Sequence, residues 1–272
     1  VFEAVYDGVT KKMRKAGGIV LAMFNFFVKV AKIQKWMSRK MFKQNACFTR
    51  YNAGLWWVIC FIPWCLLWPL YWLGDLIVFR KIKSMLGNNF RAGIAGGGAY
   101  PKVIDEFFWA IGVPLVEGYG LTETSPIISV RPFNRPVLGN VGRPIRELAA
   151  KVVDPATGKE VPRGKKGVLL VKGPTVMKGY YERPDLTKEV IDENGWFNTG
   201  DLARLTANGE IVLCGRIKDT IVQLGGENIE PVPIEMKIQE SRYIKTAVVV
   251  GQDQRYLAAL IVPEKSEIEQ FA

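Results

Sequence analysis

The sequence contains no histidine among its 272 residues. This absence excludes Ser-His-Asp and Cys-His catalysis, and any metal site with histidine ligands, within these residues. Cysteine is also scarce, and no C-x-x-C pair is present. The surroundings of the cysteines are mostly apolar, which predicts buried reduced thiols and a cytoplasmic location rather than disulfides or zinc ligands. These cysteines are Cys47, Cys60, Cys65 and Cys214.

The start of the chain lacks an initiator methionine and a signal-peptide pattern, and we expect it to lie inside a larger protein. Acidic residues are rare in residues 1–50, where eleven lysines and arginines accompany only Glu3 and Asp7, in a chain of net charge +11. A basic segment of this kind suits an anionic membrane surface or a nucleic acid. Nucleic acid is the poorer fit, because no exposed aromatic pattern typical of single-strand platforms accompanies the charge.

Two neighbouring segments indicate how this basic region is used. Apolar residues recur at helical spacing from Gly18 to Met41 with lysines between them, which predicts a basic amphipathic helix or an ordinary surface helix. Leu55–Leu73 then runs for nineteen residues without a charge and contains five tryptophans and two prolines. Its length would allow it to span a bilayer, but the prolines and the spread of tryptophans favour a kinked interfacial element. A buried core segment or the wall of an acyl tunnel is the third alternative.

Two glycine-containing stretches predict a close approach of the backbone to a ligand. Residues 96–99, GGGA, follow a short strand predicted at 91–95, and glycines leave main-chain groups free to reach a flat molecule. Residues 117–126, EGYGLTETSP, follow the apolar run 111–116, a predicted buried strand. Here Tyr119 offers a face for a base, and Thr122 and Glu123 supply oxygens suited to a phosphate and its magnesium. Taken alone, a capped turn explains this stretch equally well.

Beyond residue 140, short strand-like runs separated by Gly and Pro predict a small β-rich subdomain. Within it, GWFNTGD at 195–201 places Asp201 after a turn glycine, where its carboxylate could accept hydrogen bonds from a ribose diol. The alternative to a ribose site is that this stretch only forms the turn of a hairpin. GRIKD at 215–219 and GGENIEP at 225–231 follow, and then a helix at 233–240 and a hairpin at 244–262 are predicted.

In this order and spacing, GGGA, GYGLTE, GWFNTGD, GRIKD and GGENIEP resemble the adenylate-forming superfamily of acyl-CoA synthetases, luciferases and peptide-synthetase adenylation domains. Residues 1–9, 76–86 and 117–129 are most similar to its long-chain fatty acid:CoA ligases. The resemblance covers essentially the whole chain. It implies an α/β fold: the C-terminal half of the large adenylate-forming domain, with an α/β subdomain and a small β-rich subdomain, followed by the start of a small α+β C-terminal domain.

The resemblance also implies domain boundaries. Residues 1–216 would belong to the large AMP-binding domain, and 217–272 to a truncated C-terminal domain after a hinge. Within the large domain, 1–90 would be the basic and hydrophobic region suited to membrane contact, 91–140 would hold the adenine and phosphate site, and 141–216 would be the β-rich subdomain.

By the same resemblance, the site residues divide by the part of ATP that they contact. Gly97, Gly98 and Ala99 would line the edge of the adenine. Tyr119 would stack on its ring, with Gly120 beside it in the nucleotide site.

The remaining implied roles concern phosphate, metal, ribose and the hinge. Thr122 would contact the α-phosphate and Glu123 would hold Mg²⁺. Asp201 would bind the ribose hydroxyls together with Arg216. Lys218 matches the hinge position about which the C-terminal domain turns between half-reactions.

The implied reaction is attack of a fatty carboxylate on the α-phosphorus of ATP with release of pyrophosphate, and then displacement of AMP by the thiol of coenzyme A. Such a site must spread negative charge on phosphorus, so a metal and oriented donors matter more than a protein nucleophile. The family's Ser/Thr/Gly-rich phosphate loop and its catalytic lysine near the end of the small domain are absent from these residues. We therefore expect the chain alone to form acyl-adenylate poorly or not at all.

Other functions stay open at this point. The acid could be shorter or aromatic, and the acceptor could be an acyl carrier protein. The chain could also be a non-catalytic membrane-binding module with a vestigial nucleotide fold. For either function, the expected location is cytoplasmic or peripheral at the inner face of a membrane. Acyl chain length and oligomeric state are not encoded in any pattern of the sequence.

Overall fold

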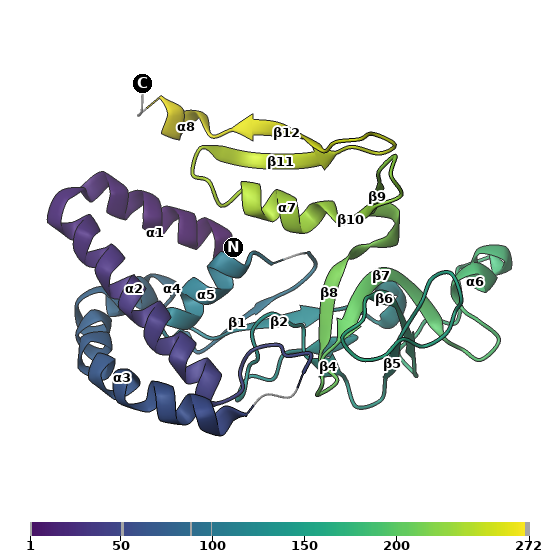
Figure 1. Cartoon of the computed structure of the whole chain (residues 1–272), viewed down its shortest axis with the longest axis horizontal. Helices are drawn as coiled ribbons and strands as arrows, with labels where there is room; N and C mark the ends of the chain where they lie inside the picture. Colours follow the sequence, from purple (N-terminus) through teal and green to yellow (C-terminus); the bar gives the residue numbers. More distant parts are fainter. Residues whose placement is uncertain (1, 50–51, 88, 99, 270–272) are drawn as a thin grey trace. The chain divides into compact units, whose positions relative to one another are not determined.

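The computed structural model describes residues 2–49, 52–87, 89–98 and 100–269, so Ala99, predicted to line the adenine, lies outside the described residues. The chain divides into two compact units. The first unit comprises Val1–Tyr119 and Val130–Gly142, and the second comprises Gly120–Ser129 and Arg143–Ala272. Figure 1 labels the helices and strands of both.

Helices make up most of the first unit. They are α1 (Phe2–Ala16), α2 (Gly18–Met41), α3 (Ala53–Gly74), the π-helical segment η1 (Asp75–Phe79), α4 (Arg80–Leu86) and α5 (Lys102–Ala110). The basic amphipathic helix predicted from Gly18 to Met41 is confirmed with the same bounds. Its apolar stripe, which includes Phe24, Phe27 and Ala31, is buried with Phe79 and Phe107 in one hydrophobic core.

Helix α3 contains the apolar run Leu55–Leu73, for which a kinked interfacial element was predicted. It continues through Pro63 and Pro69, and the helical path extends through η1 and α4. Only Cys60 and Gly74 of α3 are buried, while Val58 is 79% and Leu66 is 71% exposed. Within the described residues α3 is therefore mostly exposed, and the interfacial element, the membrane span and the buried core segment or acyl-tunnel wall all stay predictions. Ala53–Leu86 has the length and composition to cross a membrane, with 6% of its most apolar window buried.

The cysteines are free, as predicted, but their burial was predicted only in part. Cys60 is buried on the side of α3 that faces the rest of the unit, whereas Cys65 is exposed. An apolar neighbourhood in the sequence therefore does not mean burial here, because α3 presents most of its apolar side chains outward. Cys47 and Cys214 are half-buried.

Two parallel strands complete the first unit, β1 (Gly93–Ala95) and β2 (Leu115–Tyr119), with α5 between them in the chain. Gly93 pairs with Leu115 and Ala95 with Glu117. The strand predicted at 111–116 begins later, because Ile111 still caps α5 and Gly112, at φ 80°, turns the chain out of the helix. Strand β3 (Ser129–Val130) lies at the unit boundary.

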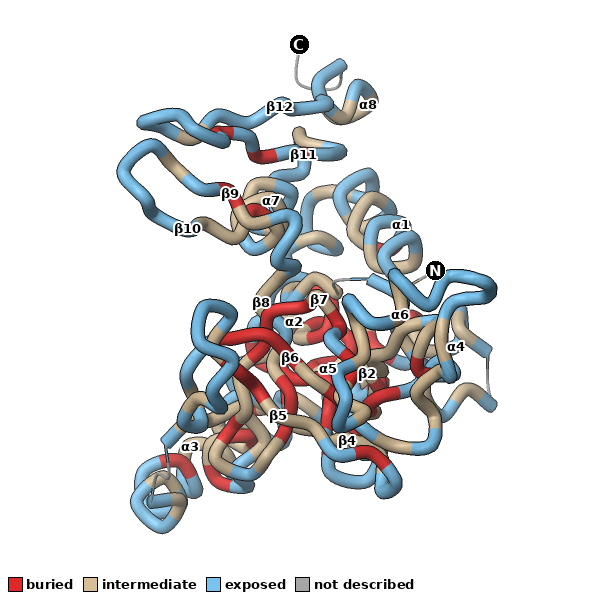
Figure 2. Tube along the Cα trace, turned by 90° about the vertical axis from the view of Figure 1, so that its right-hand side faces the viewer, coloured by how far each residue is buried: buried red, intermediate tan, exposed pale blue. Residues whose placement is uncertain are grey.

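The second unit begins with the 3-10 turn η2 (Thr122–Thr124) and β4 (Arg143–Pro144). The predicted β-rich region is confirmed as an antiparallel sheet with strand order β5-β6-β7-β8. Val153, Val168 and Leu202 form a buried cluster in this sheet, and Figure 2 shows buried residues along it. The strands are β5 (Ala149–Val153), β6 (Gly167–Lys172), β7 (Phe197–Leu205) and β8 (Ile211–Arg216), with α6 (Pro184–Val190) before β7.

The end of the second unit is a small α+β arrangement, as predicted. The antiparallel pair β11 (Ile244–Val250) and β12 (Ala258–Pro263) carries α7 (Pro231–Ile238), whose Glu235 carboxylate accepts a hydrogen bond of 2.8 Å from the Val249 amide. Figure 2 shows β12 exposed along its length. The other elements are η3 (Ile217–Asp219), β9 (Ile221–Val222), β10 (Asn228–Ile229) and α8 (Lys265–Ile268). The domain boundary at residues 216 and 217 stays a prediction.

Candidate functional site

In the first unit, the predicted adenine residues lie where β1 and β2 end. Because the strands are parallel, their carboxyl ends meet at one edge, which is where open α/β sheets bind ligands. A Cβ atom on Gly96 would lie 3.1 Å from the carbonyl oxygen of Gly118, so the two glycine stretches run side by side. Gly97 has φ 86° and a Cβ on Gly98 would meet no atom within 4 Å. The structure thus brings Gly97, Gly98 and Tyr119 to one open edge.

A buried arginine holds residues next to this edge in place, and no sequence pattern predicted it. The Arg131 side chain has no exposed surface. Its guanidinium donates to both carboxylate oxygens of Asp105 on α5, at 3.1 and 2.9 Å, and to Glu117 on β2, at 2.8 Å. It also donates twice to the carbonyl oxygen of Asn140. Glu117 is therefore held in place two residues before Tyr119.

The electrostatics of this cluster follow from its burial. Burial raises the pKa of Glu117 to about 7, with Arg131 opposing the shift and Asp105 adding to it. Burial also raises the pKa of Asp105, again against the attraction of Arg131. No local pattern could reveal the cluster, because Arg131 is 26 residues from Asp105 and 14 from Glu117 in the sequence.

In the second unit, residues 120–126 form a tight loop with separate structural and exposed hydroxyls. Thr124 is fully buried, and its hydroxyl accepts from the Leu121 amide at 3.0 Å and donates to the Leu121 carbonyl at 2.9 Å. Thr122 on the same 3-10 turn is exposed. A Cβ on Gly120 would lie 1.6 Å from the carbonyl oxygen of Pro126, so the loop closes only with glycine there. Thr122 therefore has an exposed hydroxyl that a ligand can reach, as does Ser125.

Glu123, the predicted metal ligand, is positioned from a distant loop. Its Oε1 accepts a hydrogen bond of 2.9 Å from the Tyr180 hydroxyl, and its backbone carbonyl accepts one of 2.8 Å from the Met177 amide. Partial burial and the bond to Glu123 raise the pKa of Tyr180. Sequence reasoning missed Tyr180, which is 57 residues away.

A single carboxylate suits Mg²⁺ better than a metal whose ligands all come from protein side chains. Within the described part of the chain, no group of three or more His, Cys, Asp or Glu side chains is arranged to hold a metal ion. Mg²⁺ commonly takes one or two protein carboxylates and fills its other positions with substrate phosphates and water. The donor chemistry of Glu123 therefore fits a magnesium ion bound together with a nucleotide.

Asp201 and Arg216, both predicted to contact ribose, face each other across the β7–β8 pair. They are direct register partners, and Nε of Arg216 donates to Oδ1 of Asp201 at 2.9 Å. Asp201 is 7% exposed, and its amide also bonds to the Thr199 hydroxyl at 3.1 Å. The Arg216 side chain is 57% exposed. The carboxylate is therefore held rigidly, while the guanidinium keeps contact with solvent.

Lys218 lies on the exposed 3-10 turn η3, directly after β8. The short turn joins β8 to β9, and none of its residues is buried. Two cavities of about 250 and 240 Å³ in the first unit are lined by none of the predicted site residues.

Comparison with known proteins identifies the family. Residues 19–181 match the AMP-binding enzyme family, and residues 218–271 match the AMP-binding enzyme C-terminal domain. The chain belongs to the AMP-binding enzyme family. The resemblance drawn from the sequence motifs is thereby confirmed.

The curated relatives of this AMP-binding protein include fatty acid ligases. A chloroplastic long-chain-fatty-acid–[acyl-carrier-protein] ligase of Arabidopsis thaliana is 42% identical over 289 aligned positions, which cover 99% of this chain and 39% of the relative. A probable acyl-activating enzyme of the same plant, also chloroplastic, is 41% identical over 100% of this chain and 40% of its own length. A long-chain-fatty-acid–CoA ligase of Mycobacterium bovis is 34% identical over 72% of this chain and 30% of its own length. The chain thus spans about two fifths of the first two relatives.

Solved structures confirm the fold class. ATP-bound MatB of Rhodopseudomonas palustris is 34% identical, with a TM-score of 0.57 over 63% of this chain and 35% of that protein. The o-succinylbenzoate CoA synthetase of Bacillus subtilis, in complex with the acyl-adenylate OSB-AMP, is 28% identical, with a TM-score of 0.59 over 70% of this chain and 42% of that protein. The α/β fold predicted from the motifs is that of adenylate-forming enzymes.

Proposed function

We propose that this chain is part of an enzyme that activates a long-chain fatty acid with ATP and transfers the acyl group to a thiol. The products would be a thioester, AMP and pyrophosphate. Membership of the AMP-binding family, with 42% identity to a fatty acid ligase over 99% of the chain, is the observation that carries this proposal. The open edge formed by Gly97, Gly98 and Tyr119 supplies a surface suited to a base.

The proposed roles follow from the contacts of each residue. Tyr119 stacks on the adenine, and the backbone of Gly97 and Gly98 follows its edge, where side chains would intrude. Asp201, held between the Thr199 hydroxyl and Arg216, accepts hydrogen bonds from the ribose hydroxyls. The Asp201 carboxylate would then accept hydrogen bonds from both Arg216 and the ribose.

The phosphate end is served by the 3-10 turn. The exposed Thr122 hydroxyl donates to an oxygen of the α-phosphate, where negative charge increases as the fatty carboxylate attacks. Glu123 holds Mg²⁺, which when bound neutralises phosphate charge. Tyr180 fixes the carboxylate of Glu123 in one orientation through its 2.9 Å hydrogen bond.

Coenzyme A is the acceptor that the sequence motifs imply, and acyl carrier protein is a second candidate. The second is favoured because the Arabidopsis relative that covers 99% of this chain is named an acyl-carrier-protein ligase, whereas the mycobacterial CoA ligase covers 72%. Offering each acceptor to the purified longer protein, with fatty acids of several lengths, decides between them. If no thioester forms with either acceptor, the proposed transfer step is wrong.

Glu123→Gln in the longer protein tests the activation step. We expect a loss of at least about a hundredfold in fatty-acid-dependent ATP–pyrophosphate exchange, because an amide is a poor ligand for a hard cation. Tyr180→Phe is the matched control: it removes only the hydrogen bond to Glu123 and should lower the exchange by no more than about tenfold. Unchanged exchange in Glu123→Gln would favour a non-catalytic module instead.

A further inference from the structure

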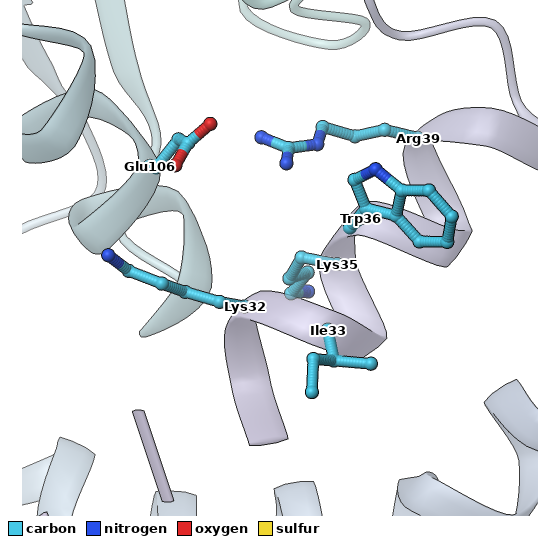
Figure 3. A pocket seen from close by; sticks show the side chains of 6 residues that line it. All are labelled: Lys32, Ile33, Lys35, Trp36, Arg39 and Glu106. Carbon is cyan, nitrogen blue, oxygen red and sulfur yellow. The ribbon is translucent and has the colours of Figure 1, made fainter. Parts of the chain in front are cut away.

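A basic cavity of about 250 Å³ lies between α2 and α5, away from every residue assigned to the nucleotide. Figure 3 shows the guanidinium of Arg39 reaching from α2 toward the carboxylate of Glu106 on α5, and Lys32 of α2 also lines the cavity. Three cationic side chains and one carboxylate line this cavity. The lining residues are Lys32, Ile33, Lys35, Trp36, Arg39 and Glu106.

Arg39 is buried without the partners that a buried guanidinium requires. The residue is 6% exposed, and its Nε has no hydrogen-bond partner among the described residues. Burial lowers the pKa of Arg39, and Glu106 and Asp105 only partly oppose that shift. Asp105 is bound to Arg131, and Glu106 lies 3.9 Å from Lys102. An anion in the cavity would satisfy the unpaired donor.

The surroundings of the cavity indicate an anion attached to a hydrocarbon. Trp36, 42% exposed at the cavity, packs edge-on against Trp56 of α3 at 5.8 Å between ring centroids. Lys35 of the cavity lies over the ring of Tyr71 of α3 at 4.9 Å. The cavity is thus in direct contact with a helix that exposes a run of large apolar side chains, including Val58, Ile62 and Leu66.

We propose that this cavity binds the phosphate group of an anionic phospholipid, with α3 in contact with the acyl chains. The charge of the lining selects the headgroup: Lys32 and Arg39 line the cavity with a single carboxylate, and Arg39 supplies an unpaired buried donor. The exposed apolar face of α3 selects the lipid over free phosphate, which offers nothing to cover it. Basic side chains beside an apolar helix are the combination that anchors proteins at anionic membrane surfaces.

Vesicle sedimentation of the full chain tests the proposal, with phosphatidylcholine vesicles that contain or lack phosphatidylglycerol. We expect binding to depend on phosphatidylglycerol and to fall at least about tenfold in Lys32→Gln/Arg39→Gln, since each basic side chain near an anionic surface adds about 1 kcal/mol. The control is Lys12→Gln/Lys15→Gln, which removes the same charge from exposed positions on α1. It should bind within about threefold of the wild type.

Any of the following three outcomes would overturn the proposal. An equal loss in both double variants would mean diffuse charge attraction. Binding of inorganic phosphate, measured by calorimetry, without binding to vesicles would mean a soluble ligand. A stable dimer that forms without lipid would mean that α3 is covered by a second copy. If circular dichroism shows that the Arg39 variant is unfolded, Lys32→Gln alone decides, with an expected loss of about threefold against no change for Lys12→Gln.

Discussion

Arg131 is a fully buried residue that links three separate parts of the first unit. Its enclosed guanidinium joins α5, β2 and the Asn140 carbonyl, so its removal would leave Asp105 and Glu117 buried without their partner. We expect Arg131→Met to lower the free energy of unfolding by about 3–5 kcal/mol. Urea denaturation measures this, and Arg135→Met is the control at an exposed position, with an expected change within about 0.5 kcal/mol. An equal decrease of the unfolding free energy in both variants would contradict the central role of Arg131.

Glu117 makes the stability of the first unit depend on pH. Burial raises its folded pKa from 4.5 to about 7, so the folded state binds more protons than the unfolded state between those values. The stability that Glu117 contributes is therefore complete below about pH 4.5 and is lost as the pH rises through about 7. We expect the unfolding free energy of the wild type to fall relative to that of Glu117→Gln across this interval. A difference that stays constant or grows with pH would show that Arg131 outweighs burial.

Gly120 and Gly98 both belong to the predicted nucleotide site but differ in what surrounds them. A methyl group at Gly120 would lie 1.6 Å from a backbone oxygen, whereas one at Gly98 would meet nothing within 4 Å. We expect Gly120→Ala to lower the unfolding free energy by more than about 2 kcal/mol, and Gly98→Ala to change it by less than about 1 kcal/mol. Gly98→Val should still fold while weakening ATP binding. Normal ATP affinity in that variant would remove Gly98 from the site.

At the residue scale, the sequence indicated the residues that we propose to face the ligand but missed those that hold them in place. Asp201 and Arg216 were predicted to act together at the ribose, and they are register partners whose side chains are joined by a hydrogen bond of 2.9 Å. Arg131 and Tyr180 carry no local pattern, because their partners lie 14 to 57 residues away. Short motifs encode loops that approach a ligand, whereas supporting contacts depend on the tertiary fold.

At the scale of elements, α3 shows why a uniformly apolar run is hard to interpret. Nineteen uncharged residues have no polar face, so periodicity cannot tell which side is buried. The amphipathic α2 and the strands β5, β6 and β8 were predicted from their apolar residues, whereas β7 was missed because the GWFNTGD stretch at its start was interpreted as a turn. The helix continues through both prolines, and the predicted kink stays a prediction.

Substitutions at two positions of α3 distinguish the role of its buried side in folding from the role of its exposed side in lipid binding. Cys60 is 3% exposed and Leu66 is 71% exposed. We expect Cys60→Asp to lower the unfolding free energy by more than about 2 kcal/mol, because it buries an unpaired charge. Leu66→Asp should change it by less than about 0.5 kcal/mol while reducing sedimentation with phosphatidylglycerol vesicles. Loss of stability in Leu66→Asp would show that this face is covered within the protein.

At the scale of the whole molecule, the order of five short motifs identified a fold that no single element reveals. The family match covers 19–181 and 218–271, and the interval between them contains Asp201 and Arg216. Length could not reveal the extent of the enzyme, because the chain covers about two fifths of the relatives that match it over its full length. Activity therefore has to be tested in the longer protein.

The proposed hinge at Lys218 gives a prediction for the complete catalytic cycle. Proline fixes φ near −65°, so Lys218→Pro should hinder rotation of the backbone in η3 while leaving the nucleotide residues unchanged. In the longer protein we expect ATP–pyrophosphate exchange within about threefold of the wild type and thioester formation lowered by at least about tenfold. Lys218→Ala should preserve both reactions, because it removes the charge but keeps the backbone free. Equal losses of both half-reactions in Lys218→Pro would mean that residue 218 supports the fold and does not act as a hinge.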